Sequence, residues 1–138
     1  MDSVLVPVDG SQQSEAAVDH ADAAFPDAEI TLIHVIDPID AGYDPESVVP
    51  GYSEDWYASR EETAEELFEE ARERTGRTFE TTIEVGRPAR KIIECAEEED
   101  IDHIVMGSHG RSGVARILLG SVAETVIRRS PVPVTVVR

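Results

Sequence analysis

The sequence has one cysteine, few aromatic residues and no long hydrophobic run. Because Cys95 is alone, an internal disulfide and a cluster of thiolate metal ligands are both excluded. No apolar stretch reaches the roughly 20 residues of a transmembrane helix, and the opening Met1-Asp2-Ser3 lacks the positive charge of a secretory signal. We therefore expect a cytoplasmic protein with no membrane partner, in which Cys95 is a buried and inert thiol.

Basic residues are also scarce. Lys91 is the only lysine, and 12 Lys and Arg stand against 29 Asp and Glu, for a formal net charge of −17. Such a surface repels nucleic acid and anionic membranes. Self-repulsion on this scale is tolerated where the Debye length falls to about 3 Å, near 1 M salt. The composition therefore predicts no nucleic-acid partner and indicates a halophilic source.

The charge is distributed unevenly along the chain. Residues 1–100 carry 27 acidic and 7 basic side chains, whereas residues 101–138 carry 2 acidic and 5 basic ones. Buried strands need few charges of either sign, which accounts for the missing acids but not for the arginines that remain. The C-terminal region is therefore where an anionic ligand is expected.

Short apolar runs alternate with amphipathic segments along the 138 residues. Strands are predicted at 4–8, 30–36, 78–85, 101–106 and 131–137, and the last helix uses Val122, Ala123, Val126 and Ile127 as its inner face. The segment from Asp37 to Asp55 is predicted as a loop, and the next helix spans 56–74. Apolar strands that alternate with helices are typical of a parallel sheet covered on both faces. We expect an α/β fold in one domain, 1–138, with a doubly wound, Rossmann-like five-stranded sheet of order 3-2-1-4-5.

Ligands of doubly wound folds bind beyond the carboxyl ends of the strands, where the winding reverses. This rule places Asp9, Val35, Gly86 and Gly107 on one rim of the sheet. Asp9 has three possible roles there: it could bond a ribose hydroxyl, bind Mg²⁺, or cap the next helix.

A glycine-bearing segment follows the fourth strand on this rim. In it, Gly110 is followed after nine residues by Gly120 and Ser121, at the start of a helix. Glycine lets backbone amides approach phosphate oxygens, and the unpaired amides of a helix N-terminus favour an anion. Arg111 and Arg116 lie in the same segment and are candidate countercharges for phosphate. The sequence therefore predicts a phosphate site here.

Four motifs give the chain a resemblance to the universal stress protein family over nearly its whole length. They are Val6-Pro7-Val8-Asp9-Gly10-Ser11, His34-Val35-Ile36, Val85-Gly86-Arg87-Pro88 and the spacing Gly107-x2-Gly110-x9-Gly120-Ser121. The last motif is similar to the ATP-binding pattern of the family's nucleotide-binding branch.

The resemblance implies a role for each matching residue. The Val35 backbone would meet adenine, Asp9 would face ribose or adenine, and the glycine motif would surround ribose and phosphates. The nucleotide-binding residues expected in this way are Pro7, Val8, Asp9, Val35, Gly86, Met106, Gly107, Gly110, Gly120, Ser121 and Val122. The ligand would be ATP, ADP or AMP, with Mg²⁺ held through the phosphates. A homodimer would form through the last strand, Val132 to Val137.

No catalytic base and no protein-ligated metal are indicated, because the histidines are scattered and no carboxylate is positioned to orient water. The expected function is that of a non-enzymatic, nucleotide-dependent stress-response or signalling module, with an unidentified partner protein. Two alternatives stay open: a dimeric interaction module that binds no nucleotide, and a slow ATPase or nucleotidyl-transfer enzyme of related architecture. The intact glycine motif argues against the first alternative.

Overall fold

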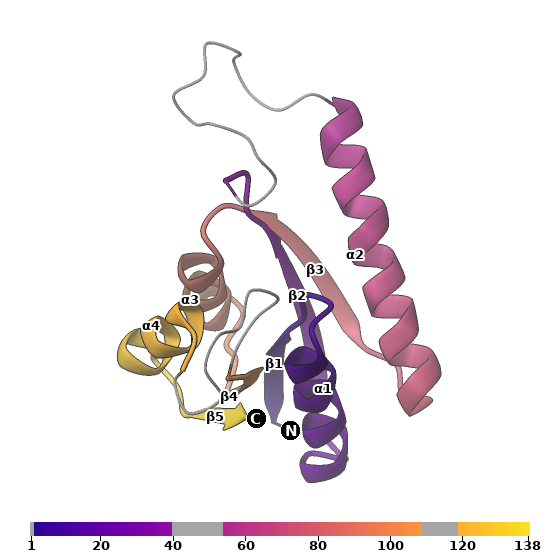
Figure 1. The fold of residues 1–138 in the computed structure, drawn as a ribbon. Helices are drawn as coiled ribbons and strands as arrows, with labels where there is room; N and C mark the ends of the chain where they lie inside the picture. The colour runs from indigo at the N-terminus through magenta and orange to yellow at the C-terminus, as the bar shows by residue number, and fades with distance from the viewer. Residues whose placement is uncertain (1, 40–53, 109–118) are drawn as a thin grey trace.

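The computed structural model describes residues 2–39, 54–108 and 119–138. Strands and helices alternate along the chain: β1 Ser3–Pro7, α1 Gln12–Ala24, β2 Glu29–Ile36, α2 Glu54–Thr75, β3 Glu80–Val85, α3 Pro88–Glu98, β4 His103–Gly107, α4 Ser121–Arg129 and β5 Val134–Val137. The strands pair in parallel in the order β3-β2-β1-β4-β5 (Figure 1). The predicted fold class and strand order are confirmed.

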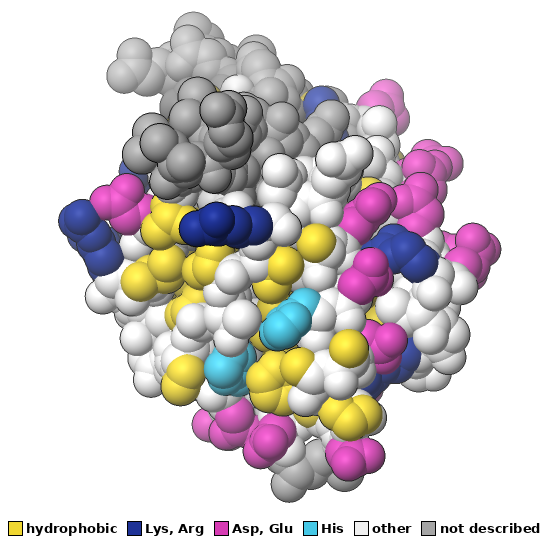
Figure 2. Space-filling model, turned by 60° about the horizontal axis from the view of Figure 1, so that its bottom comes forward, with side chains coloured by type: hydrophobic (Ala, Val, Ile, Leu, Met, Phe, Trp, Pro, Cys, Tyr) yellow, Lys and Arg dark blue, Asp and Glu magenta, His cyan; other side chains and the backbone are white. Residues whose placement is uncertain are grey.

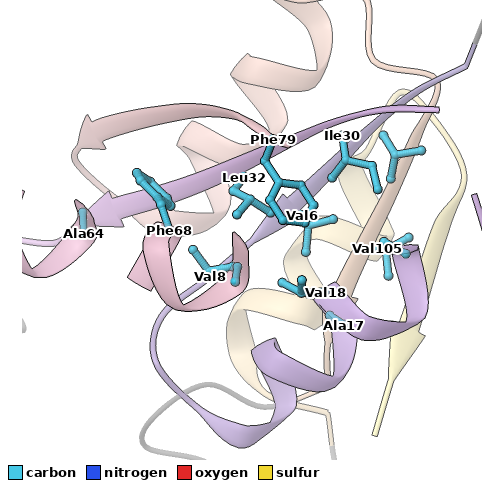
Figure 3. Packing of buried hydrophobic residues seen from close by; sticks show 13 residues of the cluster. Val6, Val8, Ala17, Val18, Ile30, Leu32, Ala64, Phe68, Phe79 and Val105 are labelled. Atoms are coloured by element: carbon cyan, nitrogen blue, oxygen red, sulfur yellow. The ribbon is translucent and has the colours of Figure 1, made fainter. Parts of the chain in front are cut away.

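Helices cover both faces of the sheet, with α1 and α2 on one side and α3 and α4 on the other (Figure 1). Successive strand residues point to opposite faces, so each central strand contributes to two cores. Figure 3 shows the core under α1 and α2, in which Val6 and Leu32 pack with Phe68 and Phe79. The other core includes Leu5, Ile33, Ile92, Ile104 and Val126. This double burial explains why the strands lack the alternation of a half-exposed sheet.

Three local predictions are corrected by the structure. α2 begins at Glu54, so the predicted loop ends before Asp55. β5 begins at Val134 rather than at residue 131, because prolines at 131 and 133 have no N–H to donate to a ladder. Ile127 is 44% exposed, although the periodicity placed it on the inner face of α4. Residues 40–53 of the predicted loop lie outside the described residues.

Cys95 is buried, as predicted, and is 8% exposed. Within the described ranges, no helix combines the length and the apolar character that a membrane span requires.

Candidate functional site

The winding of the sheet reverses between β1 and β4. β1 continues to β2 and β3 on one side, and β4 continues to β5 on the other. The carboxyl ends of β1 and β4 therefore mark the region where doubly wound folds bind their ligands, which we call the crevice. The predicted site residues Pro7, Met106 and Gly107 end these two strands, and Val8 and Asp9 directly follow β1.

The turn from β1 into α1 satisfies its own polar groups. The Asp9 carboxylate accepts hydrogen bonds from the Ser11 N–H at 2.9 Å and from the Ser11 hydroxyl at 2.6 Å. Ser11 is the N-cap of α1, and its hydroxyl oxygen accepts from the Ser14 N–H. Gly10 turns the chain with φ of +86°, a conformation that favours glycine. The start of α1 is thus capped by the protein's own side chains, and Asp9 is one of the residues that shape the cap.

The start of α4 is arranged differently. Its N-cap is Gly120, which has extended backbone angles and no side chain that could cap the helix. Ser121, a predicted nucleotide-binding residue, is the first helical residue and is exposed. The first amides of a helix have no intrahelical acceptor, and here no side-chain cap is present within the described residues. The N-terminus of α4 therefore presents the arrangement that binds anions.

Ser108 connects the elements behind this helix start. Its N–H donates to the Val137 carbonyl at 2.8 Å, and its carbonyl accepts from the Gly120 N–H at 2.7 Å. The Gly120 amide therefore has an acceptor within the protein, and the amides of Ser121, Val122 and Ala123 are the first of the helix. Because both bonds are made by the main chain, no residue type in the sequence marks this role of Ser108.

Gly107 has a packing role that its place in the glycine motif did not reveal. A Cβ atom at this position would lie 2.7 Å from Cβ, 2.8 Å from C and 2.9 Å from O of Gln13 in the first turn of α1. Two of these three atoms belong to the backbone. A glycine is therefore required for α1 to pack against the end of β4.

The main chain of Val35 faces the crevice. The Val8 N–H donates to the Ile33 carbonyl at 2.9 Å, which extends the β1–β2 ladder by one residue. Alternate residues of a parallel strand direct both main-chain groups to the same neighbour, so Val35 also directs its N–H and carbonyl toward the β1 side. There the chain has already turned into the Asp9 loop. The structure thus leaves a donor and an acceptor of Val35 directed toward the crevice.

The other predicted site residues differ in what they offer. Gly86 has φ of +151°, donates its N–H to Ile36, and lies under the side chain of Lys91. Met106 and Val8 are 4% and 6% exposed, so their side chains belong to the two cores and only their main chains could meet a ligand. Pro7 and Val122 are half-buried. Gly110, Arg111 and Arg116 lie outside the described residues.

A hollow of about 340 Å³ lies away from this crevice, between α3 and the outer strands β2 and β3. Among the described residues, six glutamates line it, and Lys91 is the one basic residue there. This charge disfavours an anionic ligand. Cys95 also lines the hollow, and burial, together with Glu99, Glu84 and Glu98, raises the pKa of its thiol to about 11. The part of the chain that the structure describes contains no group of three or more side chains able to hold a metal ion.

Comparisons with known proteins agree with this architecture. The family model described as "Universal stress protein family" matches residues 1–138. The universal stress protein MJ0577 of Methanocaldococcus jannaschii is 36% identical over 151 residues, which cover 98% of this chain and 93% of that protein. The universal stress protein MJ0531 of the same organism is 39% identical over 139 residues, with coverage of 98% and 81%.

Solved structures give the same result. The structure of MJ0577 matches with a TM-score of 0.83 and 35% identity, covering 99% of this chain and 94% of that one. A universal stress protein in complex with cAMP matches with a TM-score of 0.74 and 28% identity, covering 99% and 97%. The chain belongs to the universal stress protein family.

Proposed function

We propose that this protein is a non-enzymatic, ATP-binding stress-response or signalling module, which holds the nucleotide in the crevice between β1 and β4. The observation that carries this proposal is the uncapped N-terminus of α4 at the point where the winding reverses. Of the two helices that follow β1 and β4, α1 is closed by its own Ser11 cap, whereas α4 has uncapped amides to offer a phosphate group. A structural neighbour that is 28% identical holds cAMP, which is also an adenine nucleotide.

The remaining parts of a nucleotide have matching partners around the same crevice. The N–H and carbonyl of Val35 suit the acceptor and donor of the adenine edge. Asp9 follows β1, which lies between β2 and β4 in the sheet, and this place agrees with a ribose or adenine contact. Mg²⁺ would be held mainly by the phosphates and water, as is usual for this ion. Arg111 and Arg116 stay candidate countercharges. The described residues provide no base to activate water, so any hydrolysis is expected to be slow.

The test is to introduce a side chain that caps α4 in place of the ligand. An aspartate at an N-cap accepts the first free amides and favours the helix dipole, so G120D should stabilise α4 by about 0.5–1 kcal/mol. The same carboxylate occupies the phosphate position and repels the ligand. We expect isothermal titration with Mg-ATP in molar salt to show at least a tenfold loss of affinity.

R87D is the matched control, because α3 also has an N-cap without a side-chain cap hydrogen bond. It should stabilise its helix similarly and leave the affinity for Mg-ATP unchanged. Equal losses in both variants would show that the phosphates do not bind at α4. No binding by the nucleotide-free parent would leave the dimeric interaction module as the function.

The dimer is proposed to form through β5. This strand ends the sheet, and its free edge lies beside α4, whose Ile127 is 44% exposed. Figure 2 shows the side of the molecule that carries β5, where hydrophobic side chains gather with histidine and carboxylates lie around much of the margin. Two copies pairing along this edge would cover both the strand and the apolar surface next to it.

The hydrogen bonds of β5 indicate how to test this interface. The Pro133 carbonyl accepts from Ile104 in β4, and the Val137 carbonyl accepts from Ser108 just after it. The main-chain groups of Val134 and Val136 therefore face the free edge. V136P removes one outward donor without removing a bond to β4, whereas V136T keeps it. In sedimentation velocity, we expect V136P to lower the dimer fraction relative to V136T. Equal dimer fractions would contradict pairing through β5.

The working environment is proposed to be a concentrated salt solution. The exposed glutamates of α2 contribute to a net charge of −17, and salt screens their mutual repulsion. The thermal midpoint should therefore rise between 0.1 and 2 M KCl. A midpoint that is constant or falls over this range would contradict this part of the proposal.

A further inference from the structure

His34 occupies the end of β2, in a motif to which the proposed function assigns only Val35. Its ring nitrogen Nδ1 lies 2.8 Å from the carbonyl oxygen of Val8. A carbonyl oxygen only accepts hydrogen bonds, so Nδ1 carries the proton and donates. The bond joins residues 26 positions apart in the sequence and is partly buried.

The ring bonds a carbonyl that would otherwise be the next acceptor of the ladder. The ladder between β1 and β2 runs to the bond from the Val8 N–H to Ile33. In a parallel ladder, the next bond would run from the Val35 N–H to the Val8 carbonyl. Within the described residues that bond is absent, and the Val8 carbonyl bonds the His34 ring instead.

We propose that His34 is a positioning residue that stops the β1–β2 ladder at Val8 and so keeps the main chain of Val35 open for the base of a bound purine nucleotide. The inference rests on the proposed function, since it assigns a purpose to the open Val35 edge. It also explains why the Asp9 turn starts where it does: the Val8 carbonyl is held by a side chain rather than by a further strand bond.

Two substitutions separate this role from simple packing. H34N keeps a donor close to the position of Nδ1, because the asparagine amide nitrogen is at the same distance along the side chain. H34L fills similar space but has no donor, which leaves the Val8 carbonyl to the Val35 N–H. H103L is the matched control: His103 is also half-buried and bonds Thr135 through one ring nitrogen at 2.7 Å, but it lies at the opposite end of the sheet.

The first measurement is amide hydrogen exchange of the nucleotide-free protein by NMR. If His34 serves only in packing, its loss should speed amide exchange. If it stops the ladder, its loss should let the Val35 N–H bond the Val8 carbonyl, which slows exchange at the Val35 amide. We expect Val35 exchange to slow at least tenfold in H34L and to stay near the parent rate in H34N and H103L. The second measurement is the affinity for Mg-ATP, which should fall about tenfold in H34L alone, as expected for one lost hydrogen bond.

The outcomes separate the two proposals. Slower Val35 exchange in H34L, in a protein that does not bind ATP, would support the ladder role of His34 while rejecting the proposed function. Val35 exchange in H34L that is unchanged or faster would overturn the inference, whatever the affinity. H34N behaving as H34L does would also overturn it, since the donor would then be irrelevant.

Discussion

Gly107 allows the packing of the crevice to be tested without a ligand. In G107A, the new Cβ would lie 2.7–2.9 Å from three atoms of Gln13. Ordinary carbon contacts begin near 3.5 Å, so the first turn of α1 must move away by roughly half an ångström or more. Gly107 lies in strand β4, and its φ is not among the positive values, so the substitution adds crowding without backbone strain.

Overpacking of this kind costs about 1–3 kcal/mol. For a domain of this size, 1 kcal/mol lowers the thermal midpoint by about 3–4 °C. We therefore expect G107A to melt about 3–12 °C below the parent in differential scanning calorimetry. A midpoint within about 1–2 °C of the parent is the shift that a neutral surface substitution causes, and it would refute the packing role.

A second substitution shows which atoms cause the crowding. Q13G removes the nearest atom, the Gln13 Cβ, but leaves the backbone C and O at 2.8 and 2.9 Å from the new methyl group. Glycine inside a helix also costs about 1 kcal/mol. The double variant G107A/Q13G should therefore be no more stable than G107A. Recovery of the parent midpoint would mean that only the side chain, and not the α1 backbone, opposes a residue larger than glycine.

Three further predictions concern groups outside the crevice. Burial lowers the pKa of His103 below its usual 6.5, so the unfolded chain binds a proton at His103 more readily than the folded protein does. The urea midpoint should therefore fall as the pH drops from 7.5 to 5.5, and it should fall more in the parent than in H103Q. Arg77 donates to two carbonyl oxygens between α1 and β2 at 2.6 and 2.9 Å, so R77A should lower the free energy of unfolding in urea by about 2–3 kcal/mol. R74A removes only an exposed ion pair and should lower it by less than about 1 kcal/mol. Cys95 is buried and its pKa is raised to about 11, so a thiol reagent at pH 8 should label it far more slowly in the native protein than in urea; equal rates would contradict its burial.

The sequence was sufficient to predict the fold because each strand and helix is marked by its own pattern. Apolar runs such as Val4 to Val8 indicated buried strands, and the helices between them required parallel crossovers. The predicted fifth strand began at residue 131, before β5 starts at Val134, because an apolar run does not show where prolines interrupt the ladder. Ile127 was misplaced because helical periodicity gives a direction around the helix and not the extent of the layer beneath it.

The site was predicted only in part, for a physical reason. The rim position of Asp9, Val35 and Gly107 follows from the strand ends, which a pattern can locate. The capping of α1 by Ser11, the close approach of Gly107 to Gln13, and the bond from His34 to Val8 depend on distances between separate elements. Such distances arise from how helices and strands pack, and a periodic pattern in one segment does not contain them.

The most direct test of the account is a ¹⁵N-resolved NMR titration of the nucleotide-free protein with Mg-ATP in molar salt. Binding at the N-terminus of α4, with the base at β2, predicts large amide shifts at Val122, Ala123 and Val35. The amides of Ala89 and Arg90, at the start of α3, should stay in place. Shifts centred on α3, or no shifts at saturating ATP, would contradict the claim that the crevice between β1 and β4 is a nucleotide site.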